Sequence, residues 1–430
     1  MALLTTNVDC AAFANAWQLQ ATGKSAELVT ADTSSLTSVG ETIMRTGVEN
    51  TLSSLHVLMG KLYYNTLRYR PKGRIVRALD NGVYTSRLAV ISVYSKKAIA
   101  SGYWNTDVYP KNFAPGATNG QEFDTTTDPP TPVSSKSMWE QNPTICLEMF
   151  YEGRRVVDFE APTMYLDKLE ECFRGVEEFR GFVNASMESF ANDLAQYQEN
   201  FDREQLVSAM AQDYDMEDVR PESVVHAVTE FNQTFETSYT AKELLTTYSR
   251  DFYSWLAAKI KNIIDRMEER SILYHWSPTM VVNGVEYDLL RHVDRSSLKW
   301  AVYAPTFNDL ETYVLPEVFH DNLLKIDTGK FEKFTYWQNI NVPDSIDITP
   351  AINDADPTSE TYGQQIKGDR VQAKPLMYIF DDRRIMTSSE FKRALTSPVE
   401  ARKGYYNTFH HWSFNHISDS TMPSCLVVLD

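Results

Sequence analysis

Large apolar residues recur at helical spacing near the middle of the chain, and this repeat is its clearest hydrophobic pattern. Spacings of three and four join the seven members of the repeat: Phe179, Val183, Met187, Phe190, Leu194, Tyr197 and Phe201. Because an α-helix has 3.6 residues per turn, these side chains share one face, which predicts a helix over residues 176–212, about 55 Å long. Acidic residues are expected on the opposite face: Glu178, Glu188, Asp193, Glu199 and Asp202. We expect the apolar face to pack on a sheet.

A different pattern precedes this helix. Cations stand at every second position of a short segment and once more after it: Arg68, Arg70, Lys72, Arg74 and Arg77. An extended strand places the first four on one face, since successive side chains of a strand point to opposite faces. A turn signal at residues 80–82 then leads into a β-branched and aromatic stretch, residues 83–94. Together these features predict a long two-stranded hairpin with a basic arm.

Two segments between the hairpin and the helix have contrasting composition. Residues 115–137 are rich in Gly, Pro, Thr, Asp and Ser and predict a mobile loop. Residues 145–159 predict strand structure, with Gly153 as a bulge or turn. At the N-terminal end, residues 1–60 predict short helices separated by polar loops such as 30–37.

The second half of the chain predicts a mixed helix-and-strand region. A helix is expected over residues 221–235. The capping pattern of Thr240 and Glu243 predicts a further helix that extends to Met267. Short strands are expected near residues 299–304, 376–380 and 426–429.

Composition and charge narrow the functional classes. The chain has 430 residues, which suggests two or three packed units, and its 43% hydrophobic content argues against wholesale disorder. A net charge of −17 repels a phosphate backbone, so contact with DNA is expected to be local and non-specific. No apolar run approaches the ~18–20 residues that a membrane helix needs. The four cysteines form no CxxC pair, which is typical of free thiols.

Candidate chemistry is sparse. The histidine cluster of His410, His411 and His416 lacks the i, i+4 spacing of a helical zinc site. Adjacent acidic residues point apart on a helix or a strand, so none of the acidic pairs forms a paired-carboxylate site by itself. We therefore predict no catalytic, cofactor-binding or metal-ligating residue, no cofactor and no enzymatic activity. A carbohydrate-active hydrolase that brings together two distant carboxylates remains an alternative.

Four long phrases of the sequence resemble the major capsid proteins of tailed bacteriophages. They are YLDKLEECFRGVEEFRGFVNASMESF at 165–190, VVHAVTEFNQTFETSYTAKE at 224–243, WAVYAPTFNDLETYVLPEVFHDNLL at 300–324 and PVEARKGYYNTFHHWSFNHISDSTMPSCLVVLD at 398–430. The order of the expected elements is similar as well: an arm, a basic hairpin, a strand, a long helix and a compact mixed region. The resemblance covers nearly the whole chain.

The resemblance implies an α+β, HK-97-like fold with four parts. They are an N-terminal arm (1–60), an extended loop or E-loop (61–144), a P-domain (145–215, with returning strands at about 371–417) and an A-domain (216–370 and 418–430). The long helix would be the spine of the P-domain. The arm is expected to lie along its own subunit and a neighbour as a strap.

As a function, the resemblance implies self-assembly into hexamers and pentamers that form the icosahedral shell around a double-stranded DNA genome. The expected partners are other copies of the chain, a separate scaffolding protein, a portal, possible decoration proteins and weakly bound DNA, but no membrane. The shell would be assembled in the host bacterial cytoplasm and found in the virion. The cations from Arg68 to Arg77 are expected to contact Glu188, Asp193, Glu199 and Asp202 of a neighbouring subunit. An inner-capsid clamp protein of an unrelated virus is a second alternative.

Overall fold

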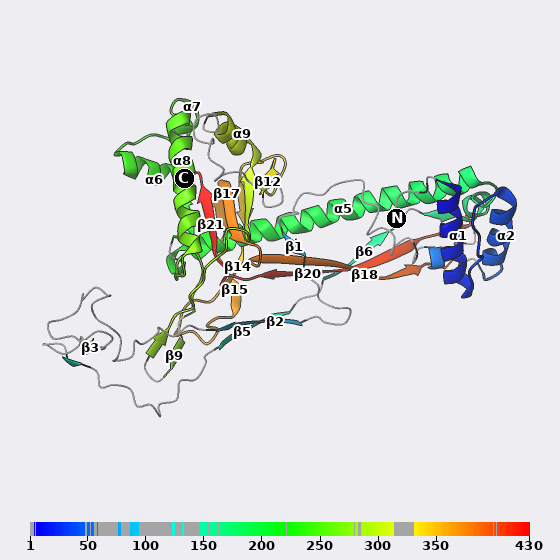
Figure 1. Cartoon of the computed structure of the whole chain (residues 1–430), viewed down its shortest axis with the longest axis horizontal. Helices are drawn as coiled ribbons and strands as arrows, with labels where there is room; N and C mark the ends of the chain where they lie inside the picture. Colours follow the sequence, from blue (N-terminus) through cyan, green and yellow to red (C-terminus); the bar gives the residue numbers. More distant parts are fainter. Residues whose placement is uncertain are drawn as a thin grey trace. The chain divides into compact units, whose positions relative to one another are not determined.

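The fold is α+β, as expected (Figure 1). The computed structural model describes residues 4, 6–47, 50–51, 53–55, 58, 76–78, 87–93, 123–124, 131–132, 146–152, 155–160, 163–220, 222–278, 280–282, 285–313, 331–398, 400 and 402–430. The described residues divide into two compact units, of which the smaller comprises those within 89–150 and 277–290.

A single helix of 40 residues, α5 (Val176–Asp215), runs through the larger unit and confirms the helix predicted over 176–212 (Figure 1). It begins after Gly175, and two glutamates in its first turn favourably face the positive end of the helix dipole. Four members of the apolar repeat are buried along it: Phe179, Val183, Leu194 and Phe201. The repeat therefore marks the buried face, as expected.

A four-stranded sheet packs along α5 in the order β1-β18-β20-β6. The strands are β1 (Arg77–Ala78), β18 (Ile385–Thr396), β20 (Thr408–Ser418) and β6 (Arg155–Glu160). β18 and β20 form a long antiparallel ladder with one irregularity between Phe391 and Arg393. The ring of Phe414 in β20 lies 4.9 Å from Tyr197 and 5.4 Å from Phe201 of α5, measured between centroids. The expectation that the long helix packs on a sheet is thus confirmed.

Two N-terminal helices, α1 (Asn7–Thr22) and α2 (Thr33–Met44), pack against the start of α5 in the same chain. Trp17 of α1 packs against the rings of both Phe173 and Phe179, with centroids 5.1 and 6.2 Å away. The prediction of a polar loop over residues 30–37 is wrong from Thr33 onward, because these residues are helical. Asp32 accepts a hydrogen bond from the Ser35 amide in a capping box, so the helix begins at Thr33.

A five-stranded sheet forms the second layer of the larger unit, in the order β12-β11-β17-β21-β8. The strands are β12 (Phe331–Phe334), β11 (Leu298–Tyr303), β17 (Pro375–Asp381), β21 (Ser424–Val428) and β8 (Val224–His226). The three predicted short strands are confirmed as β11, β17 and β21. Every residue of β17 and β21 is buried, because α8 (Ser249–Glu268) covers one face of the sheet and the C-terminal half of α5 covers the other.

The helix predicted over 221–235 is partly wrong. Val224 and Val225 join the edge of the five-stranded sheet as β8, parallel to β21, and the helix α6 begins only at Ala227 and ends at Phe235. The capping box of Thr240 and Glu243 is confirmed. It starts the short helix α7 (Ala241–Thr246), which is separate from α8.

Smaller elements complete the larger unit. They are β7 (Met164–Tyr165), α4 (Leu166–Glu171), the 3-10 helix η1 (Glu217–Val219), α9 (Ala304–Tyr313), β13 (Ile346–Ile348), β14 (Ala351–Asn353), β15 (Gln365–Lys367), β16 (Val371–Ala373) and β19 (Tyr405–Tyr406). Three two-stranded ladders pair β13 with β16, β14 with β15 and β7 with β19.

Three further strand pairs include residues of the smaller unit. They pair β2 (Arg87–Val93) with β5 (Cys146–Glu152), β3 (Phe123–Asp124) with β4 (Thr131–Pro132), and β9 (Met280–Val282) with β10 (Val285–Tyr287). The strand character predicted at 83–94 is confirmed in β2, although β2 pairs with β5. The first arm and the turn of the predicted hairpin lie outside the described residues, apart from 76–78. The loop predicted at 115–137 contains the β3–β4 ladder.

Candidate functional site

The predicted basic arm is described only at its end. Arg68, Arg70, Lys72 and Arg74 lie outside the described residues. Arg77 belongs to β1, and its guanidinium lies 3.6 Å from the carboxylate of Asp382 in the same chain. The Arg77 side chain is still half exposed in spite of this ion pair. Its contact with a second copy therefore stays a prediction.

The acidic face predicted for α5 is partly wrong. Asp193 is exposed, as expected, whereas Glu199 and Asp202 are 6% and 7% exposed and do not belong to a solvated surface. The side chain of Glu188 lies outside the described part of the chain. The C-terminal half of α5 is covered from more than one side, so a residue opposite the apolar repeat is not necessarily exposed there.

Both buried carboxylates have partners within the chain. Glu199 accepts a hydrogen bond of 2.7 Å from Arg203, one turn further along α5. Asp202 accepts one of 2.8 Å from the hydroxyl of Thr387 in β18. Burial raises the pKa of Asp202 to about 7, against the effect of the Thr387 hydrogen bond, and the charges of Glu332 and Glu199 raise it further.

A buried cluster of charged residues lies at the C-terminal end of α5, and we call it the Asp213 hub. Asp213 is fully buried and forms ion pairs with Arg220 and Arg384, the latter at 2.8 Å. Its other oxygen accepts hydrogen bonds from the hydroxyls of Tyr378 at 2.8 Å and Ser424 at 2.5 Å. One carboxylate therefore connects α5 to β17, to β21 and to the turn that enters β18.

The two arginines of the Asp213 hub extend these connections. Arg384 donates to the side chains of Gln212 at 2.7 Å and Ser418 at 2.9 Å. Arg220 donates to the Tyr274 carbonyl at 3.1 Å and to the Ser424 hydroxyl. Burial lowers the pKa of Arg220 to about 9, and the nearby charge of Arg384 lowers it too. The hub ties the ends of the four-stranded sheet to the five-stranded sheet, which is a structural role.

Sequence reasoning missed the hub, because its partners are far apart along the chain. Asp213 and Arg384 are separated by 171 positions. The available signal was local: Asp213 lies in the last turn of a helix whose preceding residues Met210 and Ala211 are apolar and buried. A charged residue beside such a run needs a buried partner.

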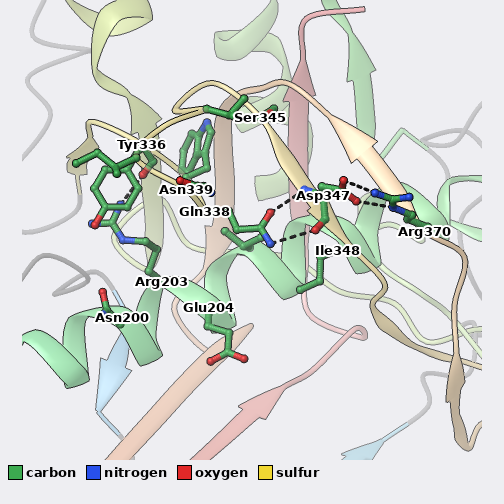
Figure 2. A pocket seen from close by; sticks show the side chains of 14 residues that line it. Asn200, Arg203, Glu204, Tyr336, Gln338, Asn339, Ser345, Asp347, Ile348 and Arg370 are labelled. Atoms are coloured by element: carbon green, nitrogen blue, oxygen red, sulfur yellow. Dashed lines mark hydrogen bonds and ion pairs between the residues drawn. The ribbon is translucent and has the colours of Figure 1, made fainter.

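A groove with a volume of about 1000 Å³ lies between α5 and the segment from Tyr336 to Ile348 (Figure 2). On one wall the guanidinium of Arg203 stacks on the Tyr336 ring, 3.9 Å from its centroid, and donates to the Tyr336 carbonyl. On the other wall Asp347 accepts two hydrogen bonds from Arg370, at 2.6 and 2.5 Å. Hydrogen bonds from Arg370 and Gln372 lower the pKa of Asp347 to about 2.

Two exposed aliphatic residues also line this groove. Ile340 is 72% exposed and Val342 is 51% exposed. Some of the polar groups are paired with one another: the dashed lines in Figure 2 join Arg203 to Tyr336, and Asp347 to both Gln338 and Arg370.

The part of the chain that the structure describes offers neither a metal site nor a membrane-spanning helix. It contains no group of three His, Cys, Asp or Glu residues arranged to hold a metal ion. Burial lowers the pKa of His410 to about 4. None of the described helices has an apolar stretch long enough to span a bilayer.

No protein-family model matches the chain, and no curated protein matches it in sequence. Solved structures of bacteriophages do match. A chain of the capsid structure of Staphylococcus phage Andhra is 12% identical, with 83% of each chain covered and a TM-score of 0.45. A chain from the structure of the head fiber and inner core protein gp22 of native bacteriophage P68 is 10% identical, again with 83% of each chain covered and a TM-score of 0.42. The asymmetric unit of the bacteriophage PhiM1 mature capsid contains a chain that is 8% identical, with 84% of this chain and 88% of that chain covered and a TM-score of 0.36.

Proposed function

We propose that this chain is the major capsid protein of a tailed bacteriophage, with an HK-97-like fold and no enzymatic activity. It assembles into hexamers and pentamers that form the icosahedral shell around a double-stranded DNA genome. The observation that carries the proposal is the architecture of the larger unit. A 40-residue helix lies along a long antiparallel ladder and ends at a separate sheet covered by helices.

We assign the parts of this architecture to the domains that the resemblance implies. α5 with β18, β20 and β6 corresponds to a P-domain and its spine. We infer that the five-stranded sheet with α6, α8 and α9 is the A-domain. The strand β2 would belong to the E-loop, and its partner β5 would begin the P-domain. The boundaries expected from the sequence are 1–60 for the arm, 61–144 for the E-loop, 145–215 with about 371–417 for the P-domain, and 216–370 with 418–430 for the A-domain. Because β17 (Pro375–Asp381) is a strand of the five-stranded sheet, we propose that the returning segment of the P-domain begins only at β18.

The proposed contact between subunits joins the basic segment of one copy to the acidic outer side of α5 in the next. The cations are Arg68, Arg70, Lys72, Arg74 and Arg77. On α5, Asp193 and Glu204 are exposed and available to them, whereas the buried Glu199 and Asp202 are not. One exposed ion pair stabilises a contact by only ~0–1 kcal/mol. Many such pairs repeated over a shell still set the register between subunits.

A triple charge reversal tests this contact. The variant Arg70→Glu, Lys72→Glu and Arg74→Glu should fold with unchanged helix content but yield at least tenfold fewer shells by negative-stain microscopy. The control replaces each of the three residues by the other basic residue type (Arg70→Lys, Lys72→Arg, Arg74→Lys). This control variant keeps the charge and should assemble normally. Normal shells from the reversed variant would refute the contact.

The proposed partners follow from the shell. They are other copies of this chain, a separate scaffolding protein, a portal, possible decoration proteins and the packaged DNA, which binds weakly because the chain carries a net charge of −17. The proposed location is the virion capsid, after assembly in the cytoplasm of the host bacterium.

A further inference from the structure

The outward face of α1 is apolar although it is exposed. Val8 is 55% exposed and Leu19 is 52% exposed, and the exposed Ala12 lies between them at helical spacing. The opposite face is fully buried, with Phe13 and Trp17 at its centre. A helix that is apolar on both faces is normally buried on both, so a second surface is expected to cover Val8, Ala12 and Leu19.

The segment after α1 extends this apolar face. The side chain of Asn15 donates to the Leu28 carbonyl at 2.8 Å and accepts from the Leu28 amide at 2.9 Å. These two bonds hold the segment against the helix, and the next residue, Val29, is 81% exposed. They also provide Asn15 with partners inside the chain. Another surface can therefore cover this side of α1 without leaving the amide of Asn15 unsatisfied.

Charge indicates what covers the face. Asp9 is the single charged residue among the 16 of α1, and its carboxylate caps the helix by accepting from the Thr6 amide and hydroxyl. Two copies of a chain with a net charge of −17 repel one another except where the surfaces that meet carry little charge. The outer face of α1 meets this requirement, which favours a second copy as its occupant.

The spacing of the apolar residues is nearly the same in both directions along the helix. In an antiparallel pair of α1 helices, Val8 of one copy lies opposite Leu19 of the other, and Ala12 lies opposite Ala16. The large residues then meet at the two ends, and the small residues in the middle allow the helices to approach closely. Such a pair is related by a twofold axis, so each copy contributes the same patch.

We propose that α1 pairs antiparallel with α1 of a second copy across a twofold axis, through Val8, Ala12, Ala16 and Leu19. This inference rests on the proposed shell function. One helix face of 16 residues covers on the order of 250 Å², from ~24 Å of length and ~10 Å of width, whereas a stable two-protein interface needs about 800 Å² per partner. The contact is therefore formed between subunits that other interfaces already hold in a shell.

Cysteine cross-linking tests the pairing. Ala12→Cys and Ala16→Cys are made separately in a Cys146→Ser background, because Cys146 is exposed while the other three cysteines are buried. A disulfide needs Cβ atoms about 3.5–4.5 Å apart, and the pairing brings residue 12 of one copy to residue 16 of the other. Particles assembled from an equal mixture of the two variants and then oxidised should therefore contain at least about threefold more covalent dimer than particles of either variant alone. Equal or absent cross-linking in the three samples would overturn the inference.

A charge placed in the face gives a second readout. Leu19→Asp should reduce the yield of closed particles at least tenfold while rings persist, whereas Gln20→Asp adds the same charge beside the face and should assemble normally. Normal particles from Leu19→Asp would overturn the α1 pairing and leave the proposed function intact. If the unaltered chain formed neither rings nor particles, the proposed function would fail, and the pairing with it.

Discussion

Replacement of Asp213 by asparagine removes the negative charge that forms ion pairs with both buried guanidiniums of the Asp213 hub. Asparagine has nearly the same shape, so packing is preserved and the effect of the charge is isolated. Arg384 at 2.8 Å and Arg220 lose their counter-ion, and the new NH2 group cannot accept a hydrogen bond from Tyr378. Loss of one partner of a buried ion pair costs about 3–5 kcal/mol. Because two arginines share this carboxylate, we expect the upper half of that range.

Urea unfolding of the unassembled chain at pH 7, followed by far-UV circular dichroism, measures this cost. The control is Asp193→Asn, which lies on the same helix and is exposed, and which should change the free energy of unfolding by less than about 0.5 kcal/mol. The double variant with Arg384→Gln should be less destabilised than the sum of the two single variants by more than about 1 kcal/mol, because the second change removes a charge that the first left unpaired. An Asp213→Asn variant within about 1 kcal/mol of the unaltered chain would refute the reasoning.

Two further predictions concern α5 and α2. Burial raises the pKa of Asp202 in the folded chain to about 7, above the ordinary value of 3.8 for an aspartate. Its contribution to stability is therefore fully present below pH 4 and is lost as the pH rises through 7. In urea titrations at pH 8, Asp202→Asn should therefore be more stable than the unaltered chain, by on the order of 4 kcal/mol at most. The difference should vanish near pH 4. A stability gain that does not depend on pH would contradict this. A Cβ at Gly40 of α2 would lie 2.5 Å from the Phe173 ring, whereas one at Gly181 of α5 would meet nothing within 4 Å. Thermal unfolding should show that Gly40→Ala destabilises the chain by about 1–3 kcal/mol and that Gly181→Ala stabilises it by about 0.5–1 kcal/mol. A stability change of the same sign in both variants would contradict the packing at Gly40.

The elements that the sequence predicts well depend on local patterns. α5 was predictable within a few residues because its apolar repeat runs through about six turns. The strands β17 and β21 were predictable because a strand buried on both faces is a short continuous apolar run. β8 was placed in a helix because the apolar spacing of residues 224–235 does not reveal that Val224 and Val225 pair with β21.

Burial of the charged residues on α5 depends on contacts that no local pattern contains. Asp202 is buried because β18 brings Thr387 to it from 185 positions away. Glu199 offered a local signal, since Arg203 follows at i+4, but that spacing is equally typical of an exposed ion pair. The sequence therefore identifies which residues carry charge, and the fold decides which of them a second subunit can reach.

The most direct test of the proposed function is sedimentation velocity of the full-length chain together with negative-stain microscopy of the same sample. The shell proposal predicts fast-sedimenting species that appear as rings of five or six subunits or as closed particles. A single slow species at every concentration tested, with no rings or particles also when proteins of the same phage head are co-expressed, would contradict it.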